Sequence, residues 1–328
     1  MTFSERNFIK QIEALTPASK DGLIKGIGDD CAVLAKSREQ ATLLTTDTLI
    51  ESVHFDPAWH PPYLLGRKAA AVNISDIAAM GGQPRFALLS LGVSVATEEY
   101  WLNQVMTGFQ SMLEEHNMIL IGGDTVSSPA LMFSVTIIGE MNANKALYRS
   151  GAKPDDLVWV SGPLGEAAAG LEICRSHEKE CERWPSLVKA HLDPRPEVEL
   201  GRILAKSGMV NSMMDLSDGI ATDLAHICTA SSTGAEILAA DIPFSESLLQ
   251  AAATLHLNPL NLALRGGEDY QLLFTSPPEH ATALPRLVRD QTGGEIFRVG
   301  RITSGQGVTL QDNDRRKDIS FQGYEHGG

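Results

Sequence analysis

Apolar and polar positions along the first half of the chain predict strands and helices in alternation. Apolar, β-rich runs predict strands at 31–35, 41–46, 85–94, 118–122 and 131–140. Between them, the 61–80 segment has a helical pattern, opened by prolines and closed before a Gly-Gly pair. Residues 97–117 predict a second helix, with Thr97 as its N-cap and acidic residues in its first turn. This half therefore predicts a mixed α/β domain.

The N-terminal segment has the pattern of an amphipathic helix. A Thr2–Glu5 capping box precedes one apolar face, made of Phe8, Ile9, Ile12 and Leu15. Charges are scattered through these residues and no apolar core of a signal peptide is visible. We expect no secretory signal and a cytoplasmic protein.

A polar, turn-rich stretch at 141–156 predicts a domain junction. We expect one domain over residues 1–143 and a second over residues 144–328, and 328 residues suffice for two cores. The second half predicts a strand at 156–162, a helix at 164–174, and a strand running into a helix over 212–232. Further strands are predicted at 271–275, 295–302 and 307–310. The predicted fold class is α/β of the α+β type, with two mixed domains.

Composition narrows the class of function. Hydrophobic residues make up 43% of the chain and charged residues 21%, the balance of a soluble globular protein. The net charge of −14, from 27 basic and 41 acidic residues, argues against a nucleic-acid or anionic-membrane partner. An acidic protein that handles phosphates needs divalent cations to neutralise them. The four cysteines form no CxxC pair, so neither a thiolate metal site nor a disulfide framework is expected.

Acidic residues recur beside Gly, Thr or Ser near the ends of the predicted strands. They are Asp29, Asp30, Asp47, Asp76, Asp124, Asp215, Asp218, Glu268 and Asp269. Magnesium takes oxygen ligands, and it commonly binds a few carboxylates together with substrate phosphates. Glycines nearby let the backbone approach a bulky anion. Together these positions predict magnesium-dependent phosphate chemistry on a small molecule.

Each position also has a purely structural interpretation. Asp-Gly pairs are ordinary turn residues, and Asp218 could serve only as a helix N-cap. Because neighbours in an extended segment point to opposite faces, we expect one main ligand from Asp29 and Asp30, and choose Asp30. Asp215 and Asp218 could share one side of a helical turn. The chain has no GxxxxGK[ST] loop and no protein-kinase motif set, so its phosphate site must be of another type.

Seven motifs occur in an order that resembles a known family. They are GIGDDCAV, TTDTLIESVHF, NISDIAAMGGQP, IGGDT, YRSGAKPDD, MDLSDGIATDL and GGEDYQLLF. This set resembles the bacterial thiamine-monophosphate kinases, within the aminoimidazole-ribonucleotide-synthetase-like superfamily. The resemblance runs from about Phe3 to Tyr324, essentially the whole chain.

The resemblance implies roles for individual residues. The implied magnesium shell is Asp30, Thr45, Thr46, Asp47, Asp76, Asp124, Asp215 and Asp218, the threonines through backbone or hydroxyl oxygens. Gly123, Arg149 and Ser217 match ATP-contacting positions, and His54 and Glu268 match positions near the acceptor. An aromatic residue near the C-terminus is expected against the acceptor ring. Phe321 is our candidate and Tyr324 the alternative.

The resemblance also implies a reaction: ATP phosphorylates thiamine monophosphate to thiamine diphosphate by direct in-line transfer, assisted by several Mg²⁺ ions. No general base or nucleophile is expected, because the acceptor phosphate is already largely ionised at neutral pH. The family pairs its N-terminal sheets in a homodimer, so residues 1–143 are expected to bind ATP and magnesium and to dimerise.

Two alternatives stay open at this level. The chain could be another ATP-dependent synthetase of the same superfamily, although no reactive cysteine precedes Cys31 as selenophosphate synthetase would require. It could also be a non-catalytic regulator that binds magnesium and nucleotide. Formation of ADP from ATP with Mg²⁺ and thiamine monophosphate would distinguish the kinase from the regulator.

Overall fold

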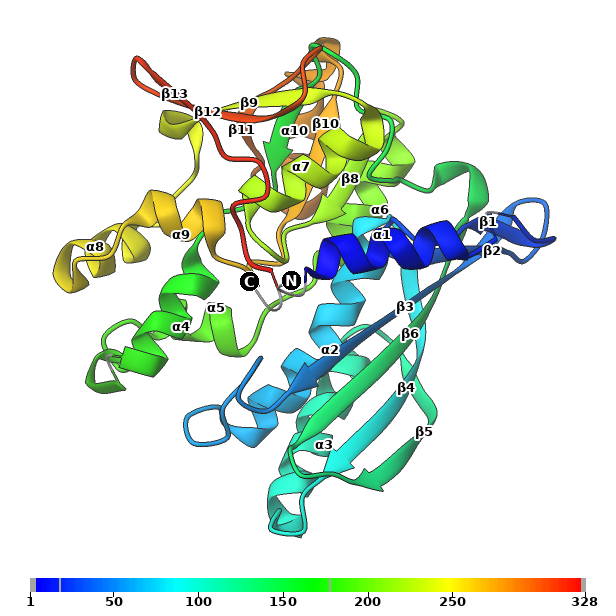
Figure 1. Ribbon diagram of the computed structural model, residues 1–328, viewed down its shortest axis with the longest axis vertical. Helices are drawn as coiled ribbons and strands as arrows, with labels where there is room; N and C mark the ends of the chain where they lie inside the picture. The colour runs from blue at the N-terminus through cyan, green and yellow to red at the C-terminus, as the bar shows by residue number, and fades with distance from the viewer. Residues whose placement is uncertain (1–3, 18, 177, 326–328) are drawn as a thin grey trace.

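The structure, a computed structural model, describes residues 4–17, 19–176 and 178–325. Two β-sheets, each with helices packed against it, form the molecule (Figure 1). The first sheet has the strand order β1-β2-β3-β6-β4-β5. Its strands are β1 (Leu23–Lys25), β2 (Ala32–Ala35), β3 (Gln40–Ile50), β4 (Gln83–Val93), β5 (Ile119–Ser127) and β6 (Met132–Asn142).

Strands β3 and β6 form the centre of the first sheet, antiparallel along their whole length. Buried and more exposed residues alternate along both, as expected for strands with only one covered face. Helices α2 (Pro62–Ala79) and α3 (Glu99–Glu115) cover that face (Figure 1). Pro62 opens α2 at its first turn, and the chain leaves the helix at Met80 before two glycines.

The second sheet has the order β13-β12-β9-β11-β7-β10-β8. Its strands are β7 (Leu157–Val160), β8 (Ser212–Asp215), β9 (Gly234–Leu238), β10 (Leu272–Ser276), β11 (Phe297–Thr303), β12 (Gly307–Asp312) and β13 (Arg315–Asp318). The helices of this half are α4 (Glu166–Ser176), α5 (Pro185–Leu192), α6 (Val198–Ser207), α7 (Ile220–Ser231), α8 (Glu246–Leu255), α9 (Pro259–Arg265) and α10 (Ala283–Thr292). The described part of the chain also contains single turns of 3₁₀ helix at Ala143–Lys145, Glu178–Glu180, Ala239–Asp241 and Pro278–His280.

Helices lie on both faces of the second sheet. Helix α7 packs with the apolar side chains of one face, and α6 with α10 packs against the other. Helices α4, α5 and α8 share a small core of their own. Helix α2 also contacts α6 and β8, so it touches elements of both halves. This position brings residues of α2 into contact with the ends of strands from the second sheet.

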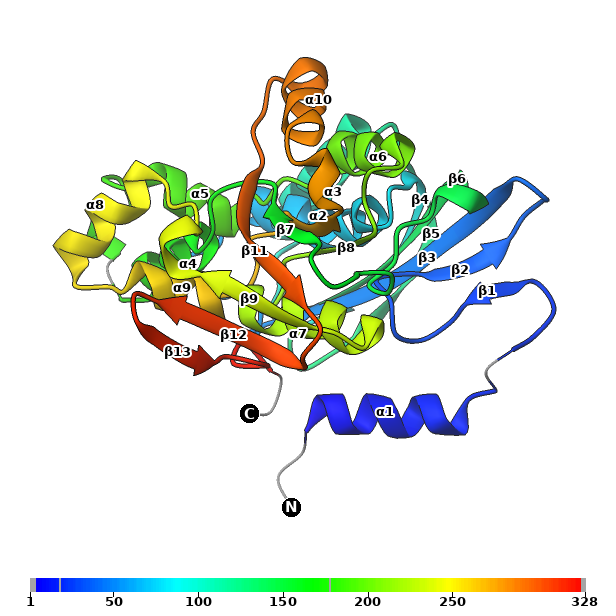
Figure 2. The same cartoon turned by 90° about the horizontal axis from the view of Figure 1, so that it is seen from above.

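The N-terminal helix α1 (Glu5–Leu15) forms as predicted, but none of its residues is buried, and it lies apart from both sheets (Figure 2). Arg6 pairs with Glu325 and lies 4.7 Å from the ring centre of Phe321. Ser4, not Thr2, precedes the first helical turn; Thr2 lies outside the described residues.

Two expectations about local structure are wrong. Glu98 rather than Thr97 is the N-cap of α3, and its side chain makes no capping hydrogen bond. Asp47 and Asp124 were expected near strand ends, but they lie inside β3 and β5, because pairing with neighbouring strands extends both beyond their apolar runs. Among the described residues, no helix is long and apolar enough to cross a membrane.

Candidate functional site

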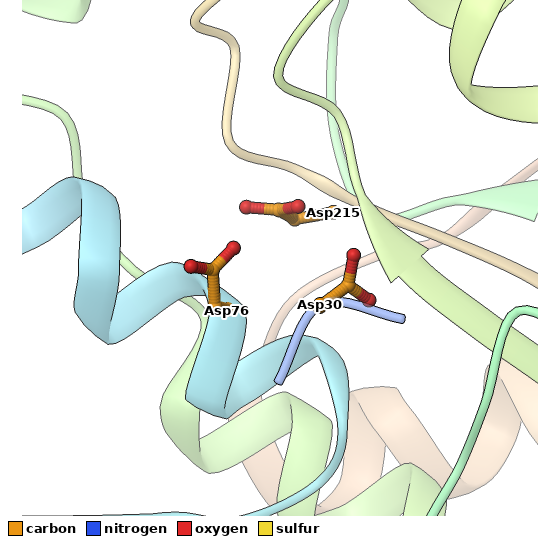
Figure 3. A group of neighbouring side chains, drawn as sticks. All are labelled: Asp30, Asp76 and Asp215. Carbon is orange, nitrogen blue, oxygen red and sulfur yellow. The ribbon is translucent and has the colours of Figure 1, made fainter. Parts of the chain in front are cut away.

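Three carboxyl groups from distant parts of the sequence converge where the two halves meet. Asp30 lies in the loop between β1 and β2, Asp76 on α2, and Asp215 at the end of β8. One oxygen of each lies within 4.8 Å of one oxygen of both others, and the groups face a shared space (Figure 3). We call these three residues the acidic cluster. Oxygen ligands at this spacing are the chemistry that magnesium prefers.

Hydroxyl groups on neighbouring elements hold the acidic cluster in place. Ser75 on α2 donates a hydrogen bond of 2.5 Å to Asp215, which links α2 to β8. Thr45 on β3 donates to Asp76. Asp47 lies two residues further along β3, and its charge is among the causes that raise the pKa of Asp76. These hydroxyl groups thus tie α2 to β8 and to β3 at the acidic cluster.

The electrostatics show how costly this arrangement is without a cation. Two unit charges ~4 Å apart repel by ~4 kcal/mol at an effective dielectric near 20. Burial, followed by the charge of Asp30, raises the pKa of Asp215 to about 7. Burial and the charges of Asp47 and Asp215 raise the pKa of Asp76 well above its usual value. Such strongly raised values in neighbouring acids are typical of metal and catalytic sites.

Arg149 supplies one compensating charge. Its guanidinium donates to Asp30 Oδ1 from Nε at 3.0 Å and from Nη2 at 2.5 Å. Its backbone N–H donates to Asp29, which also pairs with Lys25 at 3.0 Å. Asp29 is therefore engaged outside the acidic cluster, in keeping with the choice of Asp30. Asp30 Oδ2 is buried and has no hydrogen-bond partner among the residues that the structure describes, which suits a hard cation.

Two other predicted metal ligands lie elsewhere. The helical-turn interpretation of Asp215 and Asp218 is wrong, because Asp215 ends β8 and α7 begins only at Ile220. Asp218 lies in the loop between them, where its backbone N–H donates to Asp223. Asp124 lies on β5, three strands from Asp47 and so ~14 Å away across the sheet. Within one folded chain, Asp124 therefore does not reach the acidic cluster.

Three further predicted residues have clear positions but no tested role. The Thr46 hydroxyl lies within the sheet, where it donates to the carbonyl of Val135 and accepts from the Thr136 hydroxyl at 3.0 Å. A side chain at Gly123 would collide with the carbonyl oxygen of Leu89, at 1.8 Å from its Cβ. His54, in the turn after β3, accepts a hydrogen bond of 3.1 Å from the Ile50 N–H.

The GGEDY motif forms a loop docked onto the DLSDG loop. Glu268 and Tyr270 donate backbone hydrogen bonds of 2.8 Å to Ser217 and Leu216. Both donor residues have positive φ, at 68° and 48°, which is strained for side chains of this kind. Asp269 instead accepts from the backbone N–H groups of Gly165 and Ala167 at the start of α4, a structural role.

The two candidate aromatic residues have different surroundings. Phe321 is half-buried between the Arg6 guanidinium and the ring of His226, whose centre lies 5.3 Å away. Tyr324 is 47% exposed, and its backbone N–H donates to the Asp218 carbonyl. Burial, then the charges of Asp218 and Glu268, raises the pKa of Tyr324. The Tyr324 ring is thus the more exposed of the two, whereas Phe321 packs against the core of the second half.

Sequence reasoning missed Lys68 and His191, the partners of Glu268. Lys68 Nζ lies 2.9 Å from the Glu268 carboxylate, and His191 Nδ1 lies 3.0 Å from it. One signal was available: Lys68 directly precedes the small, apolar run AAAV of α2. A lysine there lies either at the surface or against a buried anion, and the helical pattern alone cannot distinguish the two.

Comparison with known proteins identifies the family. Residues 28–141 match the N-terminal domain of AIR synthase related proteins, and residues 153–313 match the C-terminal domain. The thiamine-monophosphate kinase of Escherichia coli K12 is 38% identical over 307 residues, covering 92% of this chain and 91% of that protein. The chain belongs to the thiamine-monophosphate kinase family.

Other members of the thiamine-monophosphate kinase family extend the match. The Bacillus subtilis thiamine-monophosphate kinase is 37% identical, over 96% of this chain and 98% of its own. A solved structure described as AaThiL complexed with AMPPCP and TMP superimposes with a TM-score of 0.85 at 31% identity, covering 98% of this chain and 97% of that chain. Both halves of the fold, each a mixed α/β domain, therefore match the family.

Proposed function

We propose that this protein transfers the γ-phosphate of ATP to thiamine monophosphate, giving thiamine diphosphate, by direct in-line attack of the acceptor phosphate. The observation that carries the proposal is the acidic cluster, assembled from both halves of a chain that resembles thiamine-monophosphate kinases over almost its full length. The protein would act in thiamine diphosphate biosynthesis in the cytoplasm. Residues 1–143 and 144–328 are the proposed domains.

The oxygen-only donor set and the unpartnered Asp30 Oδ2 fit magnesium. Asp30, Asp76 and Asp215 would hold it, with Asp47 and Thr45 beside them. Bound Mg²⁺ would screen the charges of the donor and acceptor phosphates. The roles of Thr46, Asp124 and Asp218 as ligands remain part of the same proposal.

The chain's own residues bind and orient the substrates in this scheme. Arg149, Ser217 and Gly123 would contact ATP. His54 and Glu268 would contact the acceptor, together with Tyr324, whose exposed ring is a better candidate than the packed ring of Phe321. No side chain has to remove a proton, since the second pKa of a phosphate monoester is ~6 and the attacking oxygen is already ionised at pH 7. Positioning and charge compensation then make up most of the catalysis.

The test is thiamine diphosphate formation from ATP, Mg²⁺ and thiamine monophosphate, followed by chromatography. Asp76→Asn should lower kcat by on the order of 100-fold, because it removes a central charge of the site. Without Mg²⁺ the same variant should melt a few degrees higher, since it relieves repulsion between buried acids. Asp290→Asn, an exposed acid on α10, is the matched control. No product from the unmodified protein, or full activity in Asp76→Asn, contradicts the proposal.

We also propose that two copies pair through the uncovered face of the first sheet. Leu88 on β4 and Ile119, Ile121 and Val126 on β5 are between 36% and 62% exposed. Exposed apolar side chains gathered on one sheet face are typical of an interface. Light scattering should give a dimer for the unmodified chain and a larger monomer fraction for Ile121→Glu; equal masses contradict this pairing.

A further inference from the structure

A buried lysine links the two halves of the molecule. The Lys68 side chain, on α2, has no exposed surface, and its Nζ lies 2.9 Å from both Oε1 and Oε2 of Glu268. Placing an ammonium group in the interior is costly, and apolar replacements of buried ion pairs are often as stable or more so. The pair is thus poorly explained as a device for stability alone.

His191 on α5 completes the environment of Glu268. Its side chain is 1% exposed and its Nδ1 lies 3.0 Å from Glu268 Oε2. Burial and the nearby Lys68 charge lower the pKa of His191. The Trp59 ring, centred 5.7 Å from that of His191, restricts the orientation of the imidazole.

Glu268 remains partly open despite these two partners. Its side chain keeps 23% of its surface exposed, and its backbone has φ of 68°. Burial alone would raise the pKa of Glu268, but the Lys68 charge and the nearby His191 ring hold it well below the usual range. A strained residue held as an anion, with one accessible side, is a typical ligand contact.

We propose that Lys68 and His191 are positioning residues that hold Glu268 as a fixed carboxylate for the organic part of the acceptor. Resting on the proposed function, the inference deepens it: the acceptor is selected for a cationic or hydrogen-bond-donating ring, as well as for its phosphate. Thiamine monophosphate carries both a thiazolium cation and an amino group.

The decisive experiment is a double-mutant cycle on KM. Lys68→Met should raise the KM for thiamine monophosphate by about 10- to 100-fold, the usual effect of losing a residue that orients a ligand group, and should change the KM for ATP less than twofold. In a Glu268→Gln background, Lys68→Met should add less than twofold to the acceptor KM. His191→Phe should behave in the same way, with a smaller effect.

Two controls keep the result interpretable. Lys189→Met removes an exposed lysine from α5 and should leave both KM values unchanged. The double variant Lys68→Met/Glu268→Gln removes both charges of this pair, so it should fold even where Lys68→Met alone does not. In that case its KM for thiamine monophosphate is compared with that of Glu268→Gln.

Equal increases in both KM values, or independent and additive effects of Lys68→Met and Glu268→Gln, would overturn the inference. Failure of the proposed function itself gives a different result, because the unmodified protein would then form no thiamine diphosphate at all.

Discussion

The side chains of the acidic cluster bring buried carboxyl groups together at a cost to the stability of the fold. Asp215 is 2% exposed and its pKa is raised to about 7, while a fully hydrated aspartate titrates near ~4. Ser75 and Arg149 offset only part of this cost, through one hydrogen bond to Asp215 and two to Asp30. Natural proteins tolerate such local instability where function requires it.

Substituting the two C-terminal aromatic residues, Tyr324 and Phe321, should show which ring binds the acceptor and which one stabilises the fold. Tyr324→Ala should raise the KM for thiamine monophosphate about 3- to 10-fold, the usual worth of one aromatic contact, without a large change in melting temperature. Phe321→Ala should do the reverse and cost about 1 kcal/mol or more of unfolding free energy, because Phe321 packs on α7. Steady-state kinetics with thermal melting measures both; a KM effect confined to Phe321→Ala would show that the acceptor ring lies on the other residue.

Helix α2 both joins the two halves of the molecule and bears residues of the candidate site. It covers the first sheet, touches α6 and β8, and bears Lys68, Ser75 and Asp76. Two glycines allow α2 and α3 to approach closely: a Cβ on Gly66 would lie 1.9 Å from the Val105 carbonyl oxygen, and one on Gly108 would lie 1.8 Å from that of Tyr63. The position of the acidic cluster therefore depends on helix packing some distance away.

Because α2 and α3 pack so closely, replacing a helical glycine by alanine should have the opposite effect from that expected of helix propensity. In an exposed helix Gly→Ala stabilises by about 1 kcal/mol, yet we expect Gly66→Ala to destabilise by about 1–3 kcal/mol, because the added methyl group forces α2 and α3 apart. Chemical denaturation measures the change. Gln110→Ala, at an exposed position of α3, should be nearly neutral. A stabilised Gly66→Ala would show that the helices do not pack this closely.

Across both domains, the acidic cluster should make stability depend on pH and magnesium together. Because the folded-state pKa of Asp215 is raised, the folded chain binds more protons than the unfolded chain between about pH 4 and pH 7. Without metal, unfolding free energy should therefore fall as pH rises through this window and level off above it. Magnesium competes with those protons, so the stabilisation that it provides should grow over the same range.

Thermal melting in EDTA and in excess Mg²⁺, at about pH 5.5 and about pH 8, tests this linkage. The shift in melting temperature caused by Mg²⁺ should be larger at the higher pH, and Asp76→Asn should reduce it. Asp290→Asn should behave like the unmodified chain. An Mg²⁺ shift that is equal at both pH values, or larger at the lower one, contradicts the predicted coupling.

Local patterns in the sequence were enough to predict most strands and helices of the first half. They also singled out Asp30, which the structure places in the acidic cluster. Alternation and helical periodicity depend on near neighbours, so a chain read in order reveals them. Patterns could not show that Asp47 and Asp124 lie inside strands, because the ends of β3 and β5 are set by the strands beside them.

The assembly of the site was decided only by tertiary structure. Asp30, Asp76 and Asp215 come from a loop, a helix and a strand, and only the packing of α2 against β8 brings them within 4.8 Å. The packing of the two halves also buries Lys68 of α2 against Glu268, a partner that the helical pattern alone does not reveal. Residue identity and spacing specify which groups are available, whereas distance, burial and the resulting pKa values exist only once the two halves have folded against each other.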